Sequence, residues 1–405
     1  MFHANQDIRC LSRFSPCGCF SSRPTGVHNP TVQPLSMEKL ERRCKRLNGL
    51  FGRLRWPAIY HFQAFGQAHK LPFHAKQPAK DLLGLSTPVL EYLSGFFDGD
   101  GCVSPAAGLS GCILTVSQSS DHGEALLLFS QTFGGSITKA NRGRGPTKPM
   151  IQWRVYGKAA RQAASELAIA SVAKKAQLLI STSWPACRSM QEELSLTLKT
   201  LKRNPEPFGN FSCSWSFIAG FFDAEGHIHV PPQGNQIRLR MVQRDAEVLH
   251  VINDFLNQAC PDQGIAIRQH GPYSWVTATR NSTCRFILER LLTAGLLVKR
   301  RSAQLVLEMT ACNHALTRTM LAGLVGNQSR YTRLDTDGCS RSRDILKIRG
   351  SLRYYSLQGR LEKVSLLQSH LAERVQNHEL SNAAARCLAL RGDIRSLLRS
   401  GATVR

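Results

Sequence analysis

Acidic residues are scarce in this chain of 405 residues. It contains 28 Asp and Glu against 52 Lys and Arg, so its formal net charge is +24 and its isoelectric point is near 10. This imbalance excludes a charge-balanced surface and indicates a polyanionic partner such as nucleic acid.

Long apolar runs and paired cysteines are also missing. No apolar run approaches the roughly 20 residues that span a bilayer, so we expect no membrane partner. The 13 cysteines include no Cys-x-x-Cys pair. Their odd number and scattered positions predict reduced thiols in an intracellular compartment and no zinc site.

What the chain does contain is a duplicated acidic string. Residues 93–101 read LSGFFDGDG, and residues 218–226 read IAGFFDAEG. Each string ends an apolar helix with two carboxylates, although a helix C-terminus already carries partial negative charge. A single pair of this kind is most simply a solvated helix end, but two matching pairs favour carboxylates that hold a divalent metal.

The duplication extends beyond the strings. A spacing of 125 residues separates three pairs of matching residues: Asp100 and Glu225, Gln118 and Gln243, and Lys174 and Lys299. The sequence therefore contains two tandem copies of a unit of about 100 residues. An alternative alignment, through the Ala-Gln-Leu strings at 176–178 and 303–305, places Val172 opposite Lys299.

Each copy is predicted to follow the order α-β-β-α-β-β-α in an α+β fold, since its strands do not alternate with helices as in a parallel α/β fold. Ser86-Thr87-Pro88 begins the first helix, which runs to Gly99. Residues 121–124 have capping-box spacing, and Asp245 opens the matching helix of the second copy. Strands are expected at 113–117, 136–140, 151–156, 237–242, 265–269 and 274–279.

With these strings, this element order and the matched glutamines and lysines, residues 86–312 resemble the LAGLIDADG homing endonucleases in their single-chain, two-motif form. The resemblance implies a pseudo-symmetric monomer whose two motif helices pack together at the centre. It also implies two antiparallel sheets that form a saddle over the DNA major groove. The small residues of 94–95 and 219–220 suit a close approach of two helix backbones.

The resemblance also implies a catalytic site. Asp100 and Glu225 match the metal-binding acid of each motif, and the carbonyls of Gly99 and Ala224 would add ligands to Mg²⁺ or Mn²⁺. Glu225 departs from the usual Asp but keeps charge and oxygen ligation. The other matches are Asp98 and Asp223 as structural acids, Gln118 and Gln243 as residues that position water or metal, and Lys174 and Lys299 as basic residues that polarise the reaction.

Basic residues recur on the predicted strands and hairpins. Arg238 and Arg240 alternate along one strand and therefore share a face. Such arginines can bind guanine edges or clamp phosphates, and the alternative is a solvated sheet face. The predicted DNA-binding residues are Lys139, Arg142, Arg144, Lys148 and Arg154 in the first copy, and Arg238, Arg240, Arg244, Arg268, His270 and Arg280 in the second.

The predicted organisation has five parts: a basic arm at 1–85, a first repeat at 86–185, a linker at 186–212, a second repeat at 213–312, and a basic helical tail at 313–405. The composition of residues 1–34 is typical of a targeting segment, but it also fits read-through from an upstream exon or an additional arm. Residues 37–56 are expected to be helical, and the tail to hold amphipathic helices at 357–375 and 383–398.

The favoured function is a site-specific, metal-dependent endonuclease that cuts double-stranded DNA. We expect an intron-encoded monomer in an organelle, either chloroplast or mitochondrion, that acts on an asymmetric target. The main alternative is an RNA-binding maturase that assists its intron and cuts nothing, and a weaker one is a regulator built on an inactive nuclease. The acids retained in both motifs favour cleavage.

Overall fold

The structure is a computed structural model that describes residues 36–75, 86–106, 108, 110–204, 213–232, 234–260, 264–324, 331 and 334–404. Residues Met37–Arg405 form one compact unit. The predicted targeting segment at 1–34 lies outside the described residues. Within them, no helix is long and apolar enough to cross a membrane.

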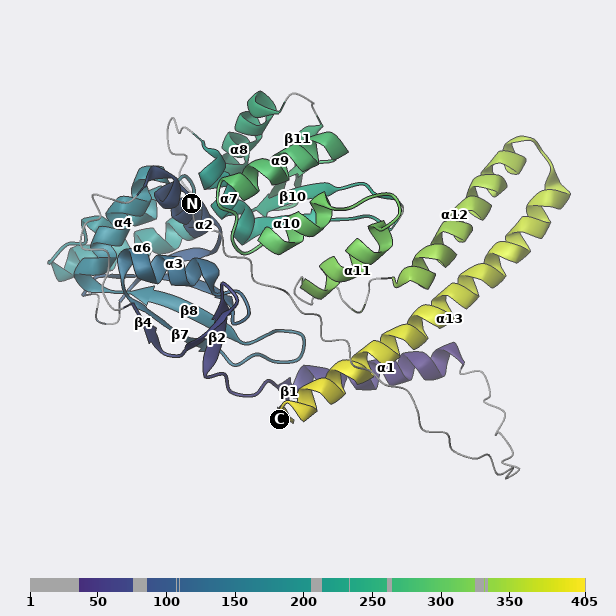
Figure 1. Ribbon diagram of the computed structural model, residues 1–405, viewed down its shortest axis with the longest axis horizontal. Helices are drawn as coiled ribbons and strands as arrows, with labels where there is room; N and C mark the ends of the chain where they lie inside the picture. The colour runs from purple at the N-terminus through teal and green to yellow at the C-terminus, as the bar shows by residue number, and fades with distance from the viewer. Residues whose placement is uncertain are drawn as a thin grey trace, which may run out of the picture. The chain divides into compact units, whose positions relative to one another are not determined.

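The first repeat has the predicted element order (Figure 1). Two further helices, α5 (Lys175–Thr182) and α6 (Arg188–Arg203), follow it, so α6 occupies much of the predicted linker. The elements of the repeat are α2 (Thr87–Asp100), β5 (Gly101–Pro105), β6 (Cys112–Ser119), α3 (Glu124–Phe133), β7 (Ser136–Asn141), β8 (Met150–Val155) and α4 (Gly157–Ala170).

The second repeat copies this order and is also followed by a short helix, α10 (Arg300–Leu307). Its elements are α7 (Trp215–Glu225), β9 (Gly226–His229), β10 (Arg238–Gln243), α8 (Ala246–Ala259), β11 (Ile265–His270), β12 (Tyr273–Ala278) and α9 (Asn281–Thr293).

Each repeat builds one antiparallel sheet with one buried face. The second sheet has the order β11-β12-β10-β9, and the first has the order β4-β7-β8-β6-β5. Its extra strand β4 (Phe73–His74) comes from the region predicted as an N-terminal arm and pairs with β7. The neighbouring hairpin of β2 (His61–Ala64) and β3 (Gln67–Lys70) buries Phe62 in the main core. Residues 61–74 therefore belong structurally to the first repeat.

Helix starts agree with the sequence only in part. Asp245 caps α8 as predicted, because its carboxylate accepts a hydrogen bond from the amide of Glu247. The capping box predicted at 121–124 is wrong: α3 begins after Gly123, and the Asp121 carboxylate instead accepts from Lys148 at 2.6 Å. The amide of Gly123 donates to Gln63 of the β2–β3 hairpin, so a tertiary contact replaces the local cap.

The remaining helices are α1 (Met37–Arg53), α11 (His314–Leu324), α12 (Thr336–Leu357) and α13 (Leu361–Arg399). Of residues 37–56, which are expected to be helical, 37–53 form α1, whereas Leu54–Arg55 form a short strand, β1. The two helices predicted at 357–375 and 383–398 are wrong as separate elements, since α13 runs through both. No glycine or proline lies between them to stop the helix. Figure 1 shows α13 alongside α1. Leu40 and Cys44 of α1 form a small buried cluster with Cys387 of α13.

The two motif helices cross at their glycines. A Cβ placed on Gly220 would overlap the carbonyl oxygen of Tyr92 and lie 2.9 Å from the amide nitrogen of Phe96. A Cβ on Gly95 would overlap the carbonyl oxygen of Phe217 in the same way. Backbone therefore packs against backbone at the centre of the molecule, which residues with side chains would prevent.

We predict that Gly220→Ala lowers the free energy of unfolding by about 3 kcal/mol or more, because the added methyl group meets backbone that cannot move alone. Gly323→Ala in α11 is the matched control, since a Cβ there meets nothing within 4 Å. The control should gain about 0.5–1 kcal/mol from lost chain entropy. Urea unfolding measures both, and an unchanged Gly220→Ala protein would contradict this helix crossing.

Candidate active site

The ends of α2 and α7 place the second acid of each motif beside the other. A Cβ on Gly99 would overlap the Cβ of Ala224 and lie 3.2 Å from the Cγ of Glu225. Each acid is followed at once by the first strand of its sheet. The carboxylates of Asp100 and Glu225 therefore lie where two helix ends and two sheets meet.

The matched glutamines contact these acids. Gln118 Nε2 donates to Asp100 Oδ2 at 2.5 Å, and Gln243 Nε2 donates to Glu225 Oε1 at 3.5 Å. Gln118 is the last residue but one of β6, and Gln243 is the last residue of β10. These strands pair with β5 and β9, which directly follow the motif helices. The amides can therefore orient the acids.

The first acids have a different environment. Asp98 is buried and accepts hydrogen bonds from the Ser171 hydroxyl and from the backbone amides of residues 172–174. Asp223 accepts from the amides of residues 297–299 and from the Tyr92 hydroxyl at 2.7 Å. Both acids thus satisfy backbone amides in the turn just before a helix, α5 and α10 respectively, which is a structural role.

The side chains of the matched lysines cap the C-terminal ends of the motif helices. The ammonium group of Lys174 donates to the carbonyls of Phe97, Asp98 and Gly99 at 2.7–2.9 Å. Lys299 does the same to residues 222–224. Val172, the alternative partner of Lys299 in the alignment, instead gives its backbone amide to Asp98. Lys174 is therefore the structural equivalent of Lys299.

Burial makes this group of charges costly. Burial raises the pKa of Asp100, and the positive charges of Lys299 and Lys174 offset this increase only in part. Burial also raises the pKa of Glu225, and the charge of Asp100 raises it further. The pKa values of both lysines are lowered by burial, against the attraction of the neighbouring acids. Four carboxylates share this region with two ammonium groups, so an added cation would be stabilised.

The donor set fits a hard divalent cation. Such ions are commonly held by one or two carboxylates together with water and substrate phosphate. Asp100 and Glu225 can supply those carboxylates. Among the described residues no group of three His, Cys, Asp or Glu side chains forms a complete metal site. The carbonyls of Gly99 and Ala224 already accept from lysines, so they have only one lone pair left for a metal.

The second sheet gathers basic and aromatic side chains on its open face. Arg238 and Arg240 are exposed while the residues between and after them are buried, so these two arginines share a face as predicted. The guanidinium of Arg240 lies 5.2 Å from the ring centre of Trp275. Trp275 in turn lies opposite Arg268 in the register of β11 and β12. Sequence reasoning missed two residues on this face, His229 opposite Arg238 and His227 opposite Arg240. The alternation of Gly-His-Ile-His was their signal.

The predicted basic residues of the first repeat do not form one surface. Arg154 is exposed on the open face. Lys139 pairs with buried Ile151 and so faces the other way, with its ammonium 4.2 Å from the ring centre of Tyr60. Lys148 is bound to Asp121. The β7–β8 loop carries Arg142 and Arg144, which bind residues near the end of α1.

The last two predicted residues lie at strand ends. Arg244 is exposed just after β10, and Arg280 is exposed at the start of α9, with its methylene groups near Gly264. They remain candidates for phosphate contacts at the rim of the second sheet.

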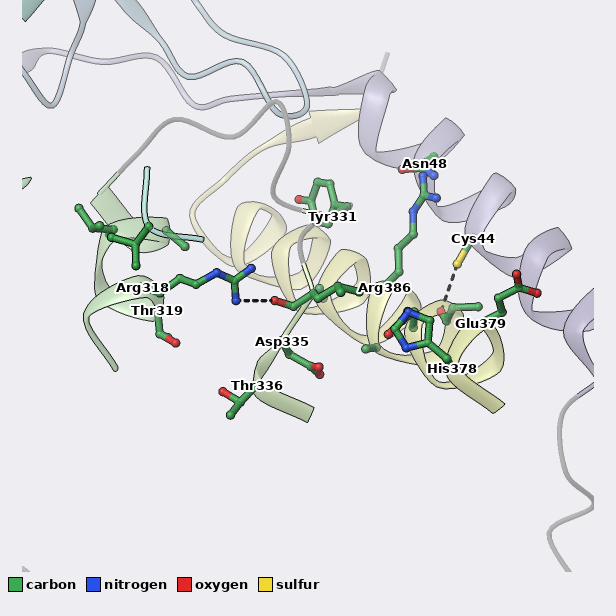
Figure 2. A pocket seen from close by; sticks show the side chains of 18 of the residues that line it. Cys44, Asn48, Arg318, Thr319, Tyr331, Asp335, Thr336, His378, Glu379 and Arg386 are labelled. Atoms are coloured by element: carbon green, nitrogen blue, oxygen red, sulfur yellow. Dashed lines mark hydrogen bonds between the residues drawn. The ribbon is translucent and has the colours of Figure 1, made fainter. Parts of the chain in front are cut away.

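A cavity of about 1250 Å³ lies apart from the acids (Figure 2). Its walls come from α1, α11, α13 and β9, and include Asn48, Arg318, His378 and Arg386. Figure 2 shows the Cys44 thiol directed at a backbone carbonyl of α13, and that bond measures 3.5 Å. No residue of the two motif helices lines this cavity, so it is separate from the site of the paired acids.

Neither a protein-family model nor a curated protein matches the sequence. Among solved structures, the meganuclease I-SmaMI bound to uncleavable DNA matches 59% of this chain and 98% of its own, with 14% identity and a TM-score of 0.40. I-GzeII with its DNA target matches 61% of this chain and 98% of its own, with 13% identity and a TM-score of 0.43. I-CpaMI bound to uncleaved DNA matches 59% of this chain and 98% of its own, with 12% identity and a TM-score of 0.41. All three are LAGLIDADG proteins, the family that the motif strings resemble.

We predict that Asp100→Asn raises the melting temperature at neutral pH in EDTA, because it removes one of four carboxylates from a buried, net negative group. The sign follows from the raised pKa of Asp100. The contribution of this group to stability is fully present below its unfolded pKa of about 3.9, and it is lost as the pH rises through its folded pKa.

The gain should therefore shrink towards acid pH. Asp254→Asn, on the exposed side of α8, is the control and should change little. Differential scanning calorimetry over pH measures both. A lower melting temperature for Asp100→Asn at neutral pH would show that the acid stabilises the fold instead.

Proposed function

We propose that this protein is a LAGLIDADG homing endonuclease that cuts both strands of a specific DNA site with the help of Mg²⁺ or Mn²⁺. The observation that carries this proposal is the pair of carboxylates, Asp100 and Glu225, which two matching helices bring together beside two sheets. An acid with a purely structural role would not have to lie beside its counterpart from the other repeat. These two acids add unfavourable charge to a buried site, which indicates a role beyond structure.

The residues divide the chemistry between them. Asp100 and Glu225 would hold the divalent ions, and the glutamines orient the acids and a water molecule. Bound metal would lower the pKa of water and neutralise charge on the leaving oxygen. Lys174 and Lys299 keep positive charge next to the acids, where it favours the developing negative charge at the phosphate.

The duplicated architecture also supports a monomer. One chain supplies both motif helices and both sheets, so it needs no partner to complete the site. The sheets differ in their basic residues, and the two DNA half-sites should therefore differ in sequence. An organellar location is part of the proposal, and the Arg- and Ser-rich composition of residues 1–34 supports it. Encoding within an intron is proposed from the resemblance of the motif strings alone.

The alternative is an RNA-binding maturase that has the same fold and charge and no nuclease activity. A protein that only binds RNA has no use for Asp100 and Glu225 in a buried position. The paired acids therefore favour cleavage over this alternative, and over a regulator without activity.

We predict that Asp100→Asn or Glu225→Gln lowers double-strand cleavage by at least about a thousandfold, because either change removes a metal ligand and its charge. Binding to duplex DNA should survive. The measurement is a plasmid-library cleavage assay with Mg²⁺ and with EDTA, beside a gel-shift assay. Wild-type cleavage by either variant, or full cleavage in EDTA, would reject the assigned site.

We also predict that DNA affinity falls steeply as salt rises, since basic side chains release counterions from phosphates. Arg238→Ala or Arg240→Ala should reduce the slope of log affinity against log salt by about one if the side chain binds phosphate. If it reads a base, the slope should stay and the selected target sequence should change. Salt-independent binding by the wild-type protein would exclude this surface.

A further inference from the structure

The tip of the β7–β8 hairpin is bound by residues 52–56, which comprise the last two residues of α1 and the three that follow it. The amide of Gly145 donates to the carbonyl of Leu54 at 2.9 Å, and the indole nitrogen of Trp56 donates to the carbonyl of Gly145 at 2.9 Å. The amide of Trp56 also approaches the carbonyl of Gly143 at 3.4 Å. We name residues 52–56 the brace.

The brace also orients two of the predicted DNA-binding arginines. Arg142 Nε donates to the carbonyl of Trp56 at 2.7 Å, and Arg144 Nε donates to the carbonyl of Gly52 at 2.5 Å. Both side chains are exposed, and the described part of the chain offers no bond to their Nη groups. A planar guanidinium anchored through Nε presents its Nη edge in a fixed direction.

The brace is held in turn by the C-terminal part of the chain. Leu54 is fully buried in a small core with Phe51 and with Leu390 and Ile394 of α13. Strand β1 (Leu54–Arg55) pairs with β13 (Thr403–Val404) at the end of the chain. The position of this hairpin therefore depends on residues far away in the sequence.

The two repeats differ at this point. In the second repeat, β11 and β12 pair as far as His270 and Tyr273 and are joined only by Gly271 and Pro272, so a tight turn sets the register. In the first repeat the connection is longer, at 142–149, and a register shift lies between Lys139 and Asn141. A long connection of this kind needs outside support to hold one conformation.

We infer that the brace is a positioning device: it fixes the β7–β8 hairpin and directs Arg142 and Arg144 at backbone phosphates of one DNA half-site. This inference rests on the proposed function for its ligand. Because the arginines are ordered when the protein folds, less conformational entropy is lost when DNA binds, and affinity rises.

The chemistry of the brace argues against a segment that blocks DNA. Residues 52–56 read GRLRW and contain no acid that would neutralise the hairpin arginines. Arg53, which is exposed, adds positive charge instead. The contacts use backbone carbonyls and the Nε atoms, so the ends of the guanidinium groups stay available for bidentate phosphate binding.

The test compares brace variants with hairpin variants, using random-sequence duplex DNA as the probe over a range of NaCl concentrations. Trp56→Phe removes the indole donor, and Ile394→Ala loosens the core below the brace. Leu388→Ala is the matched control, because it lies on the same helix α13 but is 67% exposed. The double variant Arg142→Ala/Arg144→Ala removes the phosphate contacts themselves.

We expect the double arginine variant to reduce the salt slope by about two, since two phosphate contacts are lost. Trp56→Phe and Ile394→Ala should bind about fivefold to tenfold more weakly with the slope kept, because the arginines remain but are less well ordered. Leu388→Ala should match the wild-type protein. Hydrogen exchange of residues 141–149 should be faster in the two brace variants only.

The outcomes separate the inference from the function on which it rests. If the wild-type protein binds DNA and both brace variants bind as well as it does, the positioning role is wrong. Tighter binding by the brace variants would overturn it too, since it would show a segment that blocks DNA. If the wild-type protein binds no duplex DNA, the endonuclease proposal and the phosphate role fail together, whatever hydrogen exchange shows for the hairpin.

Discussion

The close contact between Gly95 and Gly220 is the constraint on which the rest of the structure depends. Each glycine lies against a backbone carbonyl of the other motif helix, so the distance between the helices is set by main chain alone. Since Asp100 and Glu225 end these helices, the same contact sets the distance between the acids. It also places the sheets, because Gly101 and Gly226 begin their first strands directly after the acids.

The motif string combines three physical roles within nine residues. Its small residues permit the helix crossing, and its first acid satisfies backbone amides in the turn before a later helix. Its second acid lies at the seam between the two motif helices. The lysine that carries the last of these amides also donates its ammonium group to the carbonyls at the end of the motif helix. These roles are coupled, because the backbone amide of Lys174 donates to the Asp98 carboxylate while its ammonium group donates to a carbonyl at the end of the same motif helix.

Much of this frame could be predicted from the sequence because duplication repeats each local signal. The acids, glutamines and lysines recur at one spacing, and strand alternation predicted that Arg238 and Arg240 share one face of β10. The spacing could not decide between Lys174 and Val172, and only the carbonyl contacts of the ammonium groups do so. The functional assignments of these residues stay predictions until they are tested.

Other parts could not be predicted, because they depend on pairing between distant segments. Nothing local in Leu54 and Arg55 points to Thr403 and Val404, and a two-residue strand has no period to detect. The capping box at 121–124 failed for a related reason. Asp121 had a better partner in Lys148 across the sheet, and tertiary contact overrides local preference at an exposed turn.

The two repeats share their buried parts and differ where they are exposed. Both bury the same acid–amide–lysine network, since a change to any member would leave a charge or a donor unsatisfied in the core. Beyond this network, one hairpin is a tight turn and the other is a long loop held by the brace. A duplicated unit can diverge in this way only outside its seam, because the seam fixes one geometry for both copies. Under the proposed function, differences in DNA recognition between the two halves would come from the hairpins and open faces, while the acids at the seam would serve both halves alike.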